Sequence, residues 1–205
     1  MTADVNKTGK LPRQARAKAR VRSILTATTN LLKTTGTAGV TTTAIAEAAG
    51  VPVGSVYQYF DDKNDILQRL YAAAFDEIKR DVEVALGAAP ADLEFGEICD
   101  LLLNQFWQAA RAHPSFRPLT RWANREYSFV DVTLDTDEAL AEIVAHAFKS
   151  AGIIIPHNRQ KAVMRTTATI ISAVIDTAIE EKDEKKAQAL INELIRVLSC
   201  YLTRP

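Results

Sequence analysis

The chain has 205 residues, of which 47% are hydrophobic and 24% are charged, a balance that excludes disordered and fibrous proteins and suits one or two compact domains. Its two cysteines, Cys99 and Cys200, cannot make a disulfide framework and have no zinc-binding spacing, so we expect a reducing compartment and no metal site. No apolar run approaches the roughly 18 to 20 residues that cross a bilayer, and the N-terminus has no signal-sequence pattern, so we expect a cytoplasmic protein without a membrane partner.

The formal net charge of zero results from a cancellation between two parts of the chain. Residues 1–63 contain nine Lys/Arg and four Asp/Glu, whereas residues 64–205 contain 16 Lys/Arg and 21 Asp/Glu. Basic residues gather before and within the first expected helix: Lys7, Lys10, Arg13, Arg16, Lys18, Arg20 and Arg22. Such a cluster is typical of an electrostatic contact with DNA phosphates, or of a solvated tail.

Two helices are predicted before residue 50. The first ends at Gly36 and is indicated by apolar residues at helical spacing: Val21, Ile24, Leu25, Leu31 and Leu32. A short second helix follows the threonines at 41–43, whose hydroxyls can cap its free amides, and ends at Gly50. Its spacing turns three residues inward: Ile45, Ala46 and Ala49.

A third helix is predicted from Val53 to Tyr59, because Gly50 permits a left-handed turn and Pro52 suits the first turn of a helix. We expect Val51 and Val56 to join the core of these three helices. Two short helices around a glycine turn predict a helix-turn-helix from Thr41 to Tyr59, the arrangement in which the second helix enters the major groove of DNA.

The rest of the chain shows only helical patterns. Asp61 or Asp62 can cap a fourth helix, whose apolar stripe runs out near residues 87–90. Further helices are expected at about 93–112, 115–124, 137–151, 157–181 and 184–202. The predicted fold class is therefore all-α.

The stretch VTTTAIAEAAGVPVGSVYQYFDDKNDIL, residues 40–67, resembles the signature of the tetracycline-repressor (TetR) family, and the likeness extends over about residues 14–70. It implies a DNA-binding domain at 1–62 and, joined through the fourth helix, an effector-binding and dimerisation domain at 63–205. It further implies a transcription repressor that a small molecule releases from an inverted-repeat operator in double-stranded DNA. The alternative is a DNA-binding factor of the same fold that needs no effector.

The resemblance assigns seven residues to DNA contact: Thr42, Val53, Gly54, Ser55, Tyr57, Gln58 and Lys63. Thr42 can offer its hydroxyl and amide to a phosphate or simply cap its helix, and Tyr57 and Lys63 resemble phosphate clamps. The residues at 53–55 should face base edges, while Gln58 can pair with adenine or face solvent. For Phe60 we expect a place in the core. Pro52 stands where many relatives have a small capping residue, so the base contacts here can differ.

The last predicted helix has an apolar stripe wider than one packing seam needs: Ala187, Leu190, Ile191, Leu194, Ile195, Leu198 and Tyr201. By resemblance, the last two helices form a four-helix interface with a second copy in a twofold homodimer. The alternative is ordinary core within one chain.

An effector cavity is expected in the middle of the chain, lined mostly by apolar and aromatic side chains with a few polar partners. The candidates are Phe95, Cys99, Leu102, Phe106, Trp107, Arg121, Trp122, Arg125, Tyr127, Met164 and Ile171. Catalysis has no visible constellation, because the three histidines are far apart and no phosphate loop or nucleophile motif occurs. We therefore expect no enzyme activity, no cofactor, and an unknown small, largely apolar effector.

Overall fold

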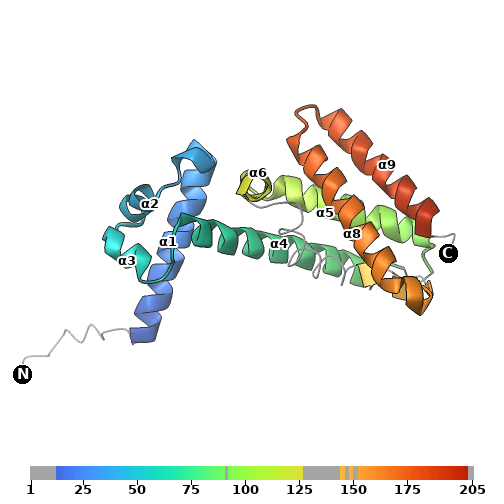
Figure 1. The fold of residues 1–205 in the computed structure, drawn as a ribbon, viewed down its shortest axis with the longest axis horizontal. Coiled ribbons are helices and arrows are strands. Elements are labelled where there is room, and N and C mark those ends of the chain that lie inside the picture. The colour runs from blue at the N-terminus through green and yellow to red at the C-terminus, as the bar shows by residue number, and fades with distance from the viewer. Residues whose placement is uncertain (1–12, 91, 127–143, 146–147, 150–151, 203–205) are drawn as a thin grey trace, which may run out of the picture. The chain divides into compact units, whose positions relative to one another are not determined.

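A computed structural model describes residues 13–90, 92–126, 144–145, 148–149 and 152–202, and within them the chain forms helices and connecting turns without a strand (Figure 1). The chain divides into two compact units, Met1–Leu70 and Tyr71–Pro205. We call the described part of the first the reading head and that of the second the C-terminal unit. The division falls inside α4 (Lys63–Gly87), whereas the boundary expected from the sequence is the first residue of that helix.

The reading head consists of α1 (Arg13–Thr35), the short 3-10 helix η1 (Thr37–Gly39), α2 (Thr42–Ala49), α3 (Val53–Tyr57) and the first turns of α4. Its core contains Phe60, from the turn between α3 and α4, and apolar side chains from every one of these helices except η1: Ile24, Leu32, Ile45, Ala46, Val56, Ile66 and Leu67. Phe60 is 2% exposed, which confirms its expected place in the core. Ala49 and Val51, also expected in the core, are only half-buried.

Local chemistry explains where α2 begins and ends. Thr41 caps it, because its Oγ1 accepts a hydrogen bond from the amide of Ala44 at 3.1 Å. Gly50 ends it in the left-handed conformation, with φ of 64°, and the amide of Val51 then donates to the carbonyl of Ala46 at 3.0 Å. α3 is two residues shorter than predicted, because the amides of both Tyr59 and Phe60 donate to the carbonyl of Val56 and the chain turns there.

The C-terminal unit contains the rest of α4, α5 (Phe95–Ala112), α6 (Phe116–Glu126), α8 (His157–Glu180) and α9 (Glu184–Leu202). α9 packs against both α5 and α8, and α8 and α9 lie side by side in Figure 1. An aromatic cluster joins α4, α5 and α6, in which the Phe106 ring lies 6.0 Å from Phe75 and 6.2 Å from Phe116. Of the helix expected at 137–151, residues 144–145 and 148–149 are helical, and the remainder lies outside the described residues.

Among the described helices, α8 is the one that is long and apolar enough to cross a membrane, judged by length and composition alone. Its most apolar 18-residue window has a mean hydropathy of 1.3 and is 39% buried within the protein. The sequence predicted a helix here, at about 157–181, but no apolar run long enough to cross a bilayer. Core helices of globular proteins have the same composition, and seven residues of α8 are buried: Val163, Thr167, Ala168, Ile171, Ile175, Ala178 and Ile179.

Candidate nucleic-acid interface and effector cavity

One face of α3 is open to solvent. Four of the residues expected to contact DNA lie on it: Val53, Gly54, Tyr57 and Gln58. Val53 is 38% exposed and Tyr57 is 55% exposed. A Cβ atom added to Gly54 meets nothing within 4 Å, and Gly54 does not have a positive φ. Neither packing nor backbone geometry in the free chain requires glycine at this position.

Ser55 departs from the expectation that it faces base edges. It is 7% exposed, and its Oγ accepts a hydrogen bond from Nη1 of Arg20 on α1 at 3.3 Å. With 3.6 residues per turn, positions 53, 54 and 57 of a helix share one face, whereas 55 and 56 turn to the other. Ser55 therefore lies with Val56 against the interior of the reading head, and the hydroxyl is used within the chain.

Thr42 and Tyr57 are joined across the helix-turn-helix. The Oγ1 of Thr42, in the first turn of α2, lies 3.1 Å from the phenol oxygen of Tyr57 on α3, and either group can donate the hydrogen bond. The side chain of Thr42 is half-buried. The cap of α2 is Thr41 and not Thr42, because Thr41 is the residue that accepts the amide of Ala44. The contact brings two expected phosphate ligands together beside the positive end of the α2 dipole.

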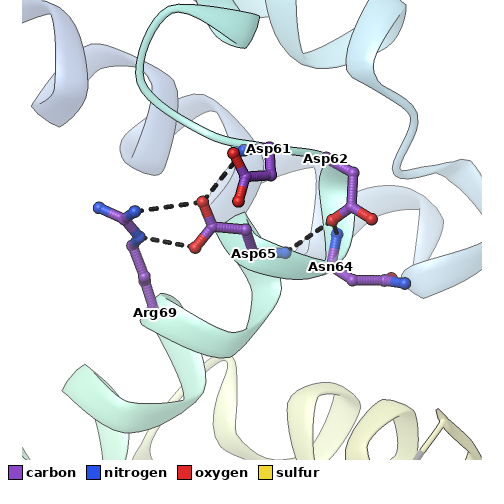
Figure 2. Close-up of polar contacts among 5 residues, drawn as sticks. All are labelled: Asp61, Asp62, Asn64, Asp65 and Arg69. Carbon is purple, nitrogen blue, oxygen red and sulfur yellow. Dashed lines mark hydrogen bonds and ion pairs between the residues drawn. The ribbon is translucent and has the colours of Figure 1, made fainter.

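Lys63 is the exposed first residue of α4, and carboxylates fix the turn before it (Figure 2). Oδ1 of Asp62 accepts hydrogen bonds from the amides of Asn64 at 2.7 Å and Asp65 at 2.9 Å. Asp62 is therefore the cap of α4, which settles the choice between Asp61 and Asp62 left open by the sequence.

A second set of contacts, made by Asp65 in the first turn of α4, stabilises the same turn. Asp65 pairs with Arg69 through two hydrogen bonds, of 2.8 and 3.1 Å, and also accepts the amide of Asp61 at 3.2 Å (Figure 2). The bond from Arg69 lowers the pKa of the Asp65 carboxyl. The Arg69 guanidinium also lies 4.9 Å from the centre of the Phe60 ring. These contacts hold the backbone that presents Lys63.

The basic cluster of the N-terminal part lies only partly within the described residues. Lys18, Arg20 and Arg22 are exposed along α1, as is Arg16, while Lys7 and Lys10 and the side chain of Arg13 lie outside the described residues. α1 also holds the turn between α2 and α3, because Oγ of Ser23 donates to the carbonyl of Ala49 at 3.1 Å.

The C-terminal unit contains a cavity of about 50 Å³ among α4, α5, α8, α9 and the helical residues Val144 and Phe148. Five of its lining residues were expected from the sequence: Phe95, Cys99, Leu102, Phe106 and Ile171. Seven others were not: Val82, Leu103, Val144, Phe148, Thr167, Leu198 and Leu202. The lining side chains are almost entirely apolar, and Thr167 is the hydroxyl-bearing residue among them.

The other expected cavity residues lie elsewhere. Arg121 pairs with Glu180 at 2.6 Å, and Arg125 is exposed, so neither supplies the polar partner of this cavity. Trp107 and Trp122 are buried, and Trp107 borders a different hollow, of about 230 Å³, beside Arg111. Met164 borders a third hollow. Tyr127 lies outside the described residues. Aromatic content alone could not separate these places, because core and cavity walls have the same composition.

Burial shifts the ionisation of three groups in the C-terminal unit. It raises the pKa of the Cys99 thiol to about 11, while a hydrogen bond with Ser199 acts in the opposite direction, so the thiol stays protonated and is a poor nucleophile. Burial also raises the pKa of Asp176 on α8 to about 6, although Asn124 on α6 hydrogen-bonds this carboxyl. The pKa of Tyr71 rises to about 12 because of burial and the nearby charge of Asp176.

The apolar stripe of α9 is divided between core and surface. Most of its residues are buried within the chain: Ala187, Ile191, Leu194, Ile195 and Leu198. Leu190 is half-buried, and Val197 and Tyr201 are 48% and 39% exposed. Packing within one chain therefore accounts for most of the stripe, and a narrower exposed part remains on α9.

Comparison with known proteins identifies both units. The family model for bacterial regulatory proteins of the tetR family matches residues 24–70, and that for the tetracyclin repressor-like C-terminal domain matches residues 96–202. A search of curated proteins found no match. Among the described residues, no group of His, Cys, Asp or Glu is placed to hold a metal ion.

Solved structures with less than 25% sequence identity share the fold. A TetR-family transcriptional regulator from Streptomyces coelicolor is 22% identical, with a TM-score of 0.64 over 90% of this chain and 98% of that one. The fatty acid degradation regulator FadR from Bacillus halodurans is 18% identical, with a TM-score of 0.63 over 88% and 94%. RolR, in complex with resorcinol, is 16% identical, with a TM-score of 0.66 over 94% and 97%.

Proposed function

Because this chain belongs to the TetR family of bacterial transcriptional regulators, which bind DNA and are not enzymes, we propose that it is a repressor released from an inverted-repeat operator by a small, largely apolar effector. The observation that carries the DNA side of the proposal is the exposed face of α3 beside the linked pair Thr42 and Tyr57. The regulator acts in the cytoplasm, where its DNA is.

On DNA, the exposed face of α3 lies in the major groove. Val53 contacts a thymine methyl, Gly54 lets the backbone approach the bases, and Gln58 pairs with adenine. Thr42, Tyr57 and Lys63 bind phosphates and set the register of the helix. Ser55 supports this face from behind, since its hydroxyl is already bonded to Arg20.

A homodimer through α8 and α9 places two reading heads on the operator. Support comes from the large apolar side chains that α9 leaves exposed, Val197 and Tyr201, which lie four residues apart and so share one helix face. Two half-sites in inverted orientation then match the twofold axis of the dimer, with centres one or more helical turns of DNA apart, roughly 34 to 36 Å each.

The effector side rests on the cavity in the C-terminal unit, whose lining fits a small apolar molecule. The similar structure of RolR is a complex with the ligand resorcinol, and FadR is a fatty acid degradation regulator, so a structure of this fold is known to hold a small molecule. An effector releases DNA only if it binds the DNA-free geometry more tightly, typically by about 1 to 3 kcal/mol.

Selection of bound duplexes from a random DNA library tests the proposal. Purified protein should enrich an inverted repeat, and its affinity for that repeat should fall steeply with salt because neutralised phosphates release counterions. A scrambled duplex of the same composition is the control, and equal affinity for both would count against the proposal. If the enriched repeat silences a reporter and no compound from a broad screen relieves the silencing, the effector-independent alternative replaces the proposed one.

A further inference from the structure

Thr167 is the polar feature of an otherwise apolar cavity. It lies on α8, is 1% exposed, and lines the cavity together with Phe95, Phe148 and nine further residues. Its Oγ1 is buried and has no hydrogen-bond partner among the residues that the structure describes. A buried hydroxyl without a partner destabilises a fold, so it is uncommon unless something else bonds to it.

Other threonines in the chain show that a helical threonine hydroxyl can bond to its own backbone. Thr28, also fully buried, donates to the carbonyl of Ile24 at 2.9 Å, and Thr177, on the same helix as Thr167, donates to the carbonyl of Ala173 at 2.7 Å. Threonine in a helix can choose this rotamer, which bonds the carbonyl four residues earlier. Thr167 does not use the equivalent bond to Val163, so a residue of the cavity wall keeps a buried hydroxyl without a partner among the described residues.

The remaining lining defines what can bond to it. Among the described residues the wall carries no charged side chain, and its second polar group, the thiol of Cys99, already has a partner in Ser199. A trapped water needs two to four polar partners, which this wall does not supply. A carboxylate or an ammonium would lose its hydration without gaining a counter-charge.

We propose that Thr167 is the polar anchor of this cavity, and that the cavity takes a small, neutral, mainly apolar molecule with a single hydroxyl or carbonyl group. This assignment rests on the proposed effector function and names the chemical class of its ligand. At about 50 Å³ the cavity holds only a few non-hydrogen atoms as it stands. A six-membered ring enters when the rings of Phe95 and Phe148, whose centroids lie 5.9 Å apart, move. Small probes therefore bind weakly, since part of their affinity is used to widen the site.

Phenol and toluene are the matched probes, because they have nearly the same shape and differ in the group that can bond to Thr167. Calorimetry and thermal shift at millimolar probe concentration give the ratio of the two affinities for the full-length protein. Thr167→Val should lower the phenol-to-toluene ratio by about two- to tenfold, the value of one neutral hydrogen bond. Thr167→Ser should restore the ratio, and Thr177→Val, on the exposed part of the same helix, should leave it unchanged. Benzoate should not bind.

Operator affinity is measured separately with the same probes, so the two proposals fail in different ways. An unchanged ratio in Thr167→Val, benzoate binding as tightly as phenol, or no binding of either neutral probe overturns the anchor assignment, whatever happens on DNA. Binding that depends on Thr167 supports the assignment even if the probes leave operator affinity unchanged, and in that case the effector-release proposal is the one that fails.

Discussion

The reading head and the C-terminal unit both cap and brace their helices with polar groups, but they differ in how completely their buried polar atoms are paired. In the head, Thr41 and Asp62 cap helices, Arg69 joins Asp65 to Phe60, and Arg20 reaches Ser55. In the C-terminal unit, polar atoms lie in the core without a partner among the described residues, including Trp107 Nε1, Ser115 Oγ and Thr167 Oγ1. Among the described residues of the head, Asn64 Oδ1 is the one buried side-chain polar atom without a hydrogen-bond partner.

This contrast matches the two tasks proposed for the units. A reading surface has to present a fixed set of groups to a regular lattice of phosphates and bases, so rigid caps and braces serve it. A sensor has to change shape when a ligand binds, and buried groups that the chain leaves unsatisfied lower the stability of the empty form. The head is therefore the part expected to be locally rigid, and the C-terminal unit the part whose stability responds to its surroundings.

Phe60→Ala should have the largest effect among the changes that test whether the two units differ in stability. Removing a ring that is 2% exposed should destabilise the head by about 3 to 5 kcal/mol, since a cavity remains where Arg69 and α1 to α4 had packed. Operator binding should be lost, and hydrogen exchange of α1 to α3 should accelerate. The thermal transition followed by tryptophan fluorescence should stay in place, because Trp107 and Trp122 both belong to the C-terminal unit.

The reciprocal control is Leu119→Ala, at a site that is 0% exposed on α6. It should shift the fluorescence transition to lower temperature and leave hydrogen exchange in α1 to α3 unchanged. If either substitution moved both readouts together, the two units would unfold as one, and the contrast drawn between them would have no thermodynamic meaning.

Asp176→Asn should stabilise the C-terminal unit at neutral pH. Burial raises the pKa of Asp176 to about 6 from a usual value near 4, so keeping it ionised at pH 7.5 costs the folded state up to about 3 kcal/mol. Asparagine keeps an oxygen that can accept the hydrogen bond from Asn124 and removes the charge. The expected result is a higher unfolding temperature at pH 7.5.

The stabilisation by Asp176→Asn should increase with pH. Between about pH 4 and pH 6 the folded state holds the proton that the unfolded chain releases, so the contribution of Asp176 to stability falls as pH rises through this window. The gain from Asp176→Asn should therefore be full above about pH 6 and disappear near pH 4. Glu180 is the charged neighbour that raises the pKa of this carboxyl further. An equal gain at pH 4 and pH 7.5 would contradict a charge effect.

The sequence predicted the head far better than the cavity, for a physical reason. Caps, glycine turns and short helices are local, so the sequence predicted the turn at Gly50 and narrowed the two caps to the threonines at 41–43 and to Asp61 or Asp62; the structure selects Thr41 and Asp62. Ser55 was the exception, because a five-residue helix leaves the choice of face open until α1 supplies Arg20. The family signature marks the motif but does not say which side of each position faces outward.

The cavity depends on contacts between helices distant in the sequence, which periodicity does not encode. Phe95 and Ile171 line this cavity, whereas Trp107 and Met164 border other hollows, because large apolar residues line most interiors and do not mark one of them. The contact of each of these residues with an effector stays a prediction. Thr167 had no signal in the sequence, since a threonine in an apolar helix usually bonds its own backbone. The ion pair between Arg121 and Glu180 likewise joins two helices, α6 and α8, so the sequence of neither helix predicts it.

Lys63→Ala tests whether the head separates positioning from reading. Loss of one phosphate contact should weaken binding to the operator and to random DNA alike, by roughly 1 kcal/mol or about fivefold at low salt, and should reduce the salt slope by about one unit. Val53→Ala is the matched change on the base-facing side and should weaken mainly operator binding. Salt titrations by fluorescence anisotropy on both duplexes provide the measurement. A Lys63→Ala variant that altered only sequence preference would show that the roles are assigned wrongly.

The smallest expected effect concerns the hydrogen bond between Arg20 and Ser55. Arg20 is exposed and the bond measures 3.3 Å, so a double-mutant cycle of Arg20→Ala and Ser55→Ala should give a coupling energy of only about 0.5 to 1 kcal/mol in the stability of the head. The cycle also separates two explanations of any loss in DNA binding. If Ser55 supports α3 only through Arg20, then Ser55→Ala should weaken operator binding in the native background and have little further effect once Arg20 is alanine. Additive losses on the operator, with Ser55→Ala changing which bases are preferred, would return Ser55 to the base-reading face and overturn the orientation of α3 described above.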